Sequence, residues 1–353
     1  MNDLGTISGA ALNQYLVSAR AAGVDPSKGL LHSGIAPALA DDPEARIPGE
    51  QFERLLIWLI ETSGDPLFGL HTSQYVQPGS YSVMGYIAMS ASTLFEALSK
   101  VALYEKLVGD MGVTETLVNE GLVEVRWICR HQKQPARRHL IENVLGSWVL
   151  YSRWLTDNSN LSPELVMLEH GAPEDRRLRE DYRRIFGCEV RFDQPCSAII
   201  SSPVSLQHRL RQPDPQLHST LEAHAARKLQ SLGIETTLTQ KVRNRILSSL
   251  TERLPRKEQV AEDLGLNVRT LHRRLQDEGT SWQDILDNLR QELARTYLRD
   301  TSMAQTEIAE RLGYSDIRSF QRSFKRHHQM TPGDYRDQNK SLPASKNLSD
   351  KSG

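Results

Sequence analysis

The chain has 353 residues, 39% of them hydrophobic and 25% charged. This composition excludes a fibrous or wholly disordered protein, and the length suggests two domains. No apolar run approaches the roughly 18–20 residues of a membrane span, the chain start lacks a signal-peptide pattern, and three scattered cysteines do not form a disulfide framework. The formal net charge of −1 is unevenly distributed, because residues 236–353 carry 21 Lys and Arg against 16 Asp and Glu, whereas the preceding residues carry 22 against 28. The two parts are therefore expected to have different partners.

The first 212 residues predict an α+β domain, with helices on a small, mainly antiparallel sheet. Four stretches with apolar residues at helical spacing predict amphipathic helices: residues 12–19, 52–60, 94–107 and 137–155. β-branched and aromatic residues in 113–118 and 122–129 predict a hairpin. The segments 189–192 and 198–200 predict a second pair of strands.

A proline-rich segment, Gln212-Pro213-Asp214-Pro215, interrupts these patterns, because proline ends both helices and strands. The predicted organisation is a domain at 1–212, a linker helix at 213–237, an all-helical domain with no strand signal at 238–338 and a disordered polar tail at 339–353. The linker helix carries an apolar stripe from Leu217 to Leu232, and either this stripe or the domain at 1–212 is expected to form a homodimer.

The all-helical domain contains a near-repeat, in which Val260–Asn267 is echoed 48 residues later by Ile308–Ser315. In each copy, a β-branched residue and an alanine precede a Leu-Gly pair, an apolar residue and a capping residue. The small alanine allows a second helix to cross closely, and the glycine favours the left-handed conformation that ends a helix. Asn267 or Ser315 then caps the next helix. Each copy therefore predicts a helix-turn-helix unit.

The second helix of each unit is expected to bury an apolar stripe and to expose a basic face. The stripes are Leu271 and Leu275 in the first unit and Phe320 and Phe324 in the second. A single unit fits a helical hairpin inside an enzyme as well as it fits DNA binding, whereas two units with basic second helices favour DNA binding. A helix over residues 282–298, about 27 Å long, would hold the two units close to one DNA turn, about 34 Å, apart.

Residues 238–336 resemble the DNA-binding domain of the AraC/XylS family of bacterial transcription regulators. The matching motifs are Arg269–Leu275, Glu278–Trp282, Ile308–Ser315, Ser319–Arg326 and Thr331–Arg336. Because family members insert both second helices into successive major grooves, the resemblance implies base contacts by Arg269, His272, Arg273, Arg318, Gln321 and Arg322. Phosphate contacts are expected from Asn267, Arg274, Ser315, Lys325 and Arg326. Ile317 departs from the family pattern, where a polar residue is common, so the second unit is expected to read fewer bases.

The first part of the chain is similar to the effector domain of the ornithine-utilisation-regulator subgroup of this family. The shared features are Ile47-Pro48, Gly64-Asp65-Pro66, Gly79–Gly85, Tyr182–Phe192 and Pro203. This resemblance implies a sensor of a small metabolite. The candidate pocket residues are Trp127, Trp148 and Tyr151, although aromatic side chains on an apolar helix are also typical of a core. Cys188 and Cys196 fit either two buried small hydrophobes or a redox switch.

The sequence lacks the motifs of common enzymes: a glycine-rich phosphate loop, a Gly-x-Ser-x-Gly elbow and a His-Glu-x-x-His pair. We therefore expect no enzymatic activity, no cofactor and no metal. The hypothesis is a cytoplasmic, nucleoid-associated transcription regulator, an activator that binds double-stranded promoter DNA under the control of a small-molecule effector. Its further expected partners are RNA polymerase and a second copy in a homodimer, with no membrane. In the alternative, the N-terminal domain is a protein-interaction and dimerisation module without a metabolite; an enzyme with a DNA-binding tail ranks third.

Overall fold

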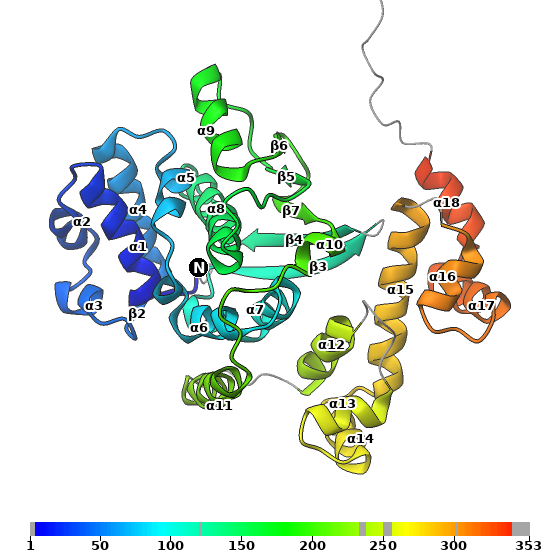
Figure 1. Ribbon diagram of the computed structural model, residues 1–353. Coiled ribbons are helices and arrows are strands. Elements are labelled where there is room, and N and C mark those ends of the chain that lie inside the picture. The colour runs from blue at the N-terminus through cyan, green and yellow to red at the C-terminus, as the bar shows by residue number, and fades with distance from the viewer. Residues whose placement is uncertain (1–3, 120–121, 233–237, 250–255, 301–302, 341–353) are drawn as a thin grey trace, which may run out of the picture. The chain divides into compact units, whose positions relative to one another are not determined.

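The computed structural model describes residues 4–119, 122–232, 238–249, 256–300 and 303–340 (Figure 1). The chain divides into an N-terminal unit, residues 1–116 and 123–236, and a C-terminal unit, residues 237–353, with which residues 117–122 are grouped. None of the described helices is both long and apolar enough to cross a membrane.

The N-terminal unit is mostly helical. Its helices are α1 (Gly9–Ala21), α2 (Pro26–Ser33), α3 (Pro37–Asp41), α4 (Gly49–Ser63), α5 (Phe68–Thr72), α6 (Ser82–Ser90), α7 (Leu94–Val108), α8 (Ala136–Thr156), α9 (Arg176–Phe186), α10 (Pro203–Leu206) and α11 (Pro215–Ser231), with the 3-10 helices η1 (Ser73–Tyr75) and η2 (Pro78–Tyr81). The four helices predicted from apolar spacing are confirmed as α1, α4, α7 and α8. The apolar faces of α1, α4 and α8 meet in one core, where the rings of Tyr15 and Phe52 pack edge to face with centroids 5.0 Å apart. The apolar face of α7 packs with α6 and α11 in a second cluster.

The strands of this unit form two sheets. They are β1 (Thr6–Ser8) and β2 (Arg46–Pro48) in an antiparallel pair, and β3 (Gly112–Asn119), β4 (Leu122–Cys129), β5 (Leu165–Met167), β6 (Glu189–Arg191) and β7 (Ala198–Ser201) in a sheet of order β3-β4-β7-β5-β6. The predicted hairpin is confirmed as β3 and β4. The predicted pairing of 189–192 with 198–200 is wrong, because β5 lies between β6 and β7. Val166 of β5 faces Ile199 in an antiparallel register and Val190 in a parallel one. A strand of three residues is too short to show an alternating pattern, which is why the sequence did not reveal it.

Helix α11 packs on α6 and α7 within the N-terminal unit. Its first turn is capped by Asp214, whose Oδ1 accepts from the backbone N–H groups of Gln216 and Leu217. Ala225 and Leu229 are buried, at 0% and 1% exposure, whereas Leu217 and Leu232 are each 40% exposed. The centre of the stripe that was expected to serve as a dimer contact is therefore covered inside the unit, because α6 and α7 bury it.

The C-terminal unit is helical throughout its described residues, as predicted. Its helices are α12 (Leu238–Ser249), α13 (Lys257–Asp263), α14 (Val268–Asp277), α15 (Trp282–Asp300), α16 (Gln305–Arg311), α17 (Ile317–His328) and α18 (Pro332–Lys340). Within this unit, α13 and α14 lie at one end of α15, and α16, α17 and α18 lie along its other half (Figure 1). Helix α18 extends two residues into the predicted polar tail; residues 341–353 of that tail lie outside the described residues.

Candidate DNA interface and effector cavity

Both predicted helix-turn-helix units are present, as α13 with α14 and as α16 with α17, and their turns share one geometry. Gly265 and Gly313 adopt φ values of +66° and +67°, the left-handed conformation that glycine adopts most readily. The N–H of the residue after each glycine donates to the carbonyl of the repeated alanine, from Leu266 to Ala261 at 2.8 Å and from Tyr314 to Ala309 at 2.9 Å. This is the helix-ending arrangement that the near-repeat predicts.

The N-terminal caps of the two second helices differ. Asn267 caps α14, as predicted, and its Oδ1 accepts from the N–H of Thr270 at 2.8 Å. The prediction that Ser315 caps α17 is wrong, because the second unit has one additional residue and Asp316 takes the position. The Asp316 carboxylate accepts from the N–H of Ser319 at 2.8 Å and from the Ser315 hydroxyl at 3.0 Å. These hydrogen bonds, with the backbone bond from Ser319 as the largest cause, lower the pKa of Asp316 to about 2.

The second helices bury their apolar stripes and expose basic faces. Leu271, Leu275, Phe320 and Phe324 are all 0% exposed, as predicted. Five of the six predicted base-contacting side chains are exposed: Arg269, His272, Arg273, Arg318 and Arg322. The sixth, Gln321, is half-buried and donates to Gln305 Oε1 at 2.9 Å. Of the predicted phosphate contacts, Asn267, Arg274, Ser315, Lys325 and Arg326 are also exposed.

The exposed arginines on the two second helices are electrostatically unpaired. No side chain of Arg269, Arg273, Arg318 or Arg322 forms an ion pair with another described residue. Arg322 makes a single long hydrogen bond, from Nη2 to the Ser319 hydroxyl at 3.5 Å. These donors are therefore accessible to an external anion or base edge, as DNA recognition requires.

Helix α15 holds the second unit through two polar side chains that the sequence reasoning missed. Arg290 donates to the carbonyl oxygens of Leu312 and Gly313, at the end of α16. Gln291 is 4% exposed and donates to the hydroxyls of Tyr314 and Ser323, both at 3.0 Å. The only sequence signal was an arginine and a glutamine between apolar positions of the helix.

The first unit is tied to α12 through charged side chains as well. The Glu278 carboxylate accepts from the N–H groups of Leu238 and Thr239, at 2.6 and 2.8 Å, and so caps α12. Arg245 of α12 pairs with Asp263 of α13 at 2.6 Å. Because both units are fixed to neighbouring helices, the two basic faces belong to one packed domain.

The N-terminal unit contains a cavity of about 140 Å³ between α6, α7, α8 and the five-stranded sheet, which we call the α6–α8 cavity. Trp148 and Tyr151, two of the residues predicted for an effector pocket, line it. The Tyr151 hydroxyl donates to the carbonyl of Gly85 at 2.8 Å. Trp127 is not among the lining residues: it is buried in the core, against Gly112, where its ring leaves no room for a β-carbon. Two of the three predicted pocket residues therefore line one cavity.

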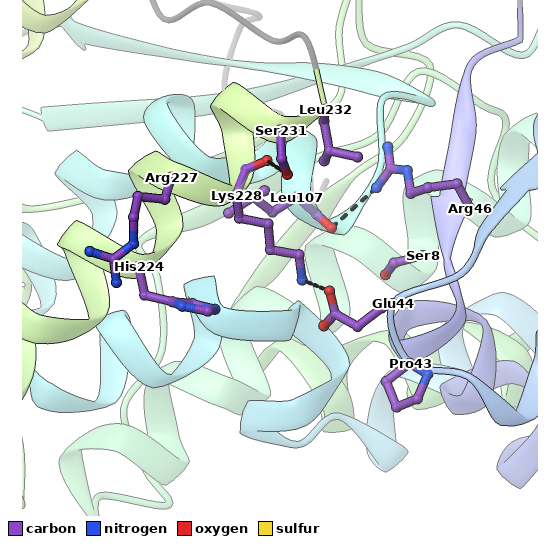
Figure 2. A pocket seen from close by; sticks show the side chains of 10 residues that line it. All are labelled: Ser8, Pro43, Glu44, Arg46, Leu107, His224, Arg227, Lys228, Ser231 and Leu232. Carbon is purple, nitrogen blue, oxygen red and sulfur yellow. Dashed lines mark hydrogen bonds and ion pairs between the residues drawn. The ribbon is translucent and has the colours of Figure 1, made fainter.

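A second cavity of about 590 Å³, lined by both charged and apolar residues, lies where α11 meets the loop before β2 (Figure 2). Figure 2 shows Lys228 directed at the carboxylate of Glu44 and Arg46 directed at the carbonyl of Leu107. Lys228 also donates to the Ser82 hydroxyl at 3.2 Å. Lys228 and Arg46 therefore have partners within the unit and anchor α11, whereas Arg227, which also lines this cavity, forms no ion pair with another described residue.

The cysteines Cys188 and Cys196 are half-buried and form no disulfide. Burial raises the pKa of the Cys188 thiol to about 11 and also raises that of Cys196. A protonated thiol is a poor nucleophile, so these values favour the interpretation of small, partly buried side chains. Among the described residues, no group of three or more His, Cys, Asp or Glu is arranged to hold a metal ion.

Comparisons with known proteins match both units. The model for the arabinose-binding domain of the AraC transcription regulator matches residues 23–210, and a helix-turn-helix domain model matches residues 260–338. The ornithine utilization regulator of Pseudomonas aeruginosa is 26% identical over 303 residues, 86% of this chain and 88% of the relative. The transcriptional activator RhaS of Salmonella arizonae is 40% identical over 87 residues, 24% of this chain and 31% of the relative.

Among solved structures, the transcriptional regulator CdpR from Pseudomonas aeruginosa is similar, with a TM-score of 0.43 and 24% identity; the match covers 88% of this chain and 96% of that chain. The family model of the N-terminal unit spans more than half of the chain, and the helix-turn-helix model covers the two units whose geometry is described above. The chain therefore belongs to the AraC family of DNA-binding transcription regulators.

Proposed function

We propose that this regulator is an activator whose binding to promoter DNA is controlled by a small molecule held in its N-terminal unit. The observation that carries the DNA-binding part is the pair of second helices with unpaired, exposed arginines, both fixed to neighbouring helices of one domain. Two units on one rigid support suit two successive major grooves. The similarity of an 87-residue part of the chain to RhaS, which is named as an activator, supports activation.

Control by an effector is supported by the N-terminal unit. The α6–α8 cavity is lined by aromatic and hydroxyl groups that suit a small ligand. A unit that serves only for dimerisation does not need such a cavity. An effector shifts an equilibrium between two states only by the difference in its affinity for them. We therefore propose that the ligand changes how a homodimer presents its two DNA-binding domains to the promoter and to RNA polymerase.

The proposal is tested with the full-length protein in two steps. Genome-wide footprinting identifies bound promoters, and a reporter fused to one of them measures whether transcription rises with the protein. Metabolite classes are then screened for a change in promoter affinity and for a rise in melting temperature, because a ligand that binds the native state stabilises it. Loss of transcription on deletion of the gene supports an activator, and increased transcription contradicts it. A thorough screen without any hit would favour the protein-interaction module.

A further inference from the structure

We infer that the effector site is the α6–α8 cavity and that it takes an uncharged, mainly apolar molecule of about the size of one substituted aromatic ring. This inference rests on the proposed control by an effector and specifies where the effector binds and of which chemical class it is.

The lining of the cavity carries no ionisable acid or base of the Asp, Glu, Lys, Arg or His type. Its walls are built from aliphatic side chains of α7, β4 and β7, such as Val101, Val125 and Ile199, together with the ring of Trp148. An ion that enters such a site loses its hydration and gains no opposite charge. An amino-acid zwitterion, a polyamine or a carboxylate is therefore disfavoured, although a relative of this chain is named for ornithine utilization.

The volume limits the size of the ligand. The cavity measures about 140 Å³, close to an engineered apolar cavity of about 150 Å³ that stays dry and binds benzene. A single ring with a small substituent fits this space, whereas a long acyl chain or a fused polycyclic compound extends beyond it or requires the walls to move.

The polar groups of the lining indicate that the substituent forms an uncharged hydrogen bond. The hydroxyl of Ser152 donates to the carbonyl of Trp148 at 2.8 Å and is thus occupied. The hydroxyls of Ser162 and Ser201 make no hydrogen bond with any other described residue. A hydroxyl, carbonyl or amide of the ligand can satisfy one of these groups without adding a charge.

One residue that lines the cavity also packs in the apolar cluster of α11, the helix that precedes the DNA-binding domain in the chain. Met84 of α6 lines the cavity and belongs to the same apolar cluster as Ala225 and Leu229 of α11. A ligand that displaces Met84 therefore acts on the packing surface of α11. The chain continues from α11 through residues 233–237 to α12 of the DNA-binding domain.

Three compounds that share one ring and differ in charge test the inference: benzyl alcohol, benzoate and benzylammonium. They are titrated into the full-length protein at neutral pH and followed by ligand-observed NMR. We expect saturable binding of benzyl alcohol, with a dissociation constant at least tenfold lower than that of either ion. Equal or tighter binding of benzoate or benzylammonium would overturn the assignment of an uncharged ligand.

Variants on α6 test the location. Ala88 lines the cavity and is half-buried, whereas the neighbouring Met89 does not line it. We expect Ala88→Phe to weaken benzyl alcohol binding at least tenfold and Met89→Phe to change it by less than twofold, with both melting temperatures close to that of the wild type. Leu98→Trp fills the cavity from α7 and replaces Ala88→Phe if that variant does not fold. Binding that survives both cavity-filling variants would overturn the location.

A failure of this inference is distinguishable from a failure of effector control. If L-ornithine or putrescine shifts promoter affinity equally in the wild type and in Ala88→Phe, effector control stands and the assigned site is wrong. If neither charged nor uncharged compounds change promoter affinity in a broad screen, effector control itself fails.

Discussion

The guanidinium of Arg290 donates to the carbonyl oxygen of Gly313 at 2.9 Å, so a side chain of α15 holds the turn of the second helix-turn-helix unit. A further bond from the same guanidinium reaches the carbonyl of Leu312 at 2.8 Å. Carbonyl groups at a helix end have no partner within their own helix. Arg290 therefore fixes the position of α17 by satisfying the end of α16.

Replacing Arg290 with methionine is expected to loosen the second unit while the first remains in place. Arg290 is only 16% exposed, and the loss of its two bonds should cost roughly 1–2 kcal/mol. Amide hydrogen exchange in α16 and α17 should accelerate about tenfold, and promoter affinity should fall. Arg295→Met on the exposed face of the same helix is the control for stability. Equal exchange rates in Arg290→Met and wild type would contradict the role of this contact.

The base contacts predicted for Arg273 and Arg322 are tested by alanine substitution. Both side chains are exposed and unpaired on their helices. If each arginine contacts a base pair bidentately, each substitution should remove about 1–3 kcal/mol of discrimination between the correct base pair and a wrong one. Affinity for a footprinted promoter and for variants with single base changes measures this loss. Arg176→Ala, an exposed arginine of the N-terminal unit, serves as the charge-matched control. Unchanged selectivity in both variants would show that other residues read the bases.

Lys325 is expected to contact a phosphate rather than a base. The Lys325→Ala variant should weaken binding to all DNA sequences by a similar factor, because phosphate contacts carry no sequence information. The slope of log affinity against log salt should decrease by about 1. Titrations at several salt concentrations, on specific and random duplexes, provide the measurement. A loss confined to the specific duplex would instead place Lys325 at a base.

Much of the DNA-binding domain could be predicted from the sequence, because its signals are local. A glycine such as Gly265 needs only its own backbone conformation to end a helix, and a stripe such as Phe320 and Phe324 is visible within one helix. The predicted cap of α17, Ser315, is one residue too early, because an inserted residue shifts the cap to Asp316 without changing the pattern around it.

The features that depend on distant contacts could not be predicted. Strand β5 is too short for a pattern and is placed only by its neighbours. Trp127 and Trp148 are both aromatic residues among apolar neighbours in the sequence, yet only Trp148 lines the cavity. The apolar stripe of α11 indicated a buried face but not its partner, which is α6 and α7 rather than a second chain at Ala225 and Leu229.

The burial of Leu229 predicts a stability effect rather than a dimerisation effect. Leu229→Ala should destabilise the N-terminal unit by about 2–5 kcal/mol, as expected for a buried leucine, whereas Leu232→Ala, 40% exposed in the wild type, should have little effect. Urea unfolding followed by tryptophan fluorescence reports mainly on this unit, which holds four of the five tryptophans. Light scattering of both variants measures the oligomeric state. A dimer lost in Leu229→Ala without a change in stability would restore the stripe as a dimer contact.

The aspartate cap of α17 predicts a sensitivity to acid that the asparagine cap of α14 does not share. The pKa of Asp316 is about 2 in the folded protein, below its ordinary value of 3.8, so the carboxylate stabilises the helix above about pH 4. This stabilisation is lost as the pH falls from about 4 toward 2, because protonation then occurs in the folded state as well.

Asp316→Asn keeps an oxygen that accepts from the N–H of Ser319 but removes the titrating group, since asparagine is also a favourable cap. The melting temperature of this variant should therefore fall less steeply than that of the wild type between pH 5 and pH 2.5, while the two stay similar near pH 7. Asp316→Ala should be destabilised near pH 7, because it has no acceptor at all. If the melting temperatures of the wild type and Asp316→Asn fall in parallel as the pH is lowered, Asp316 does not titrate as its hydrogen bonds imply. The caps of α14 and α17 would then be energetically equivalent.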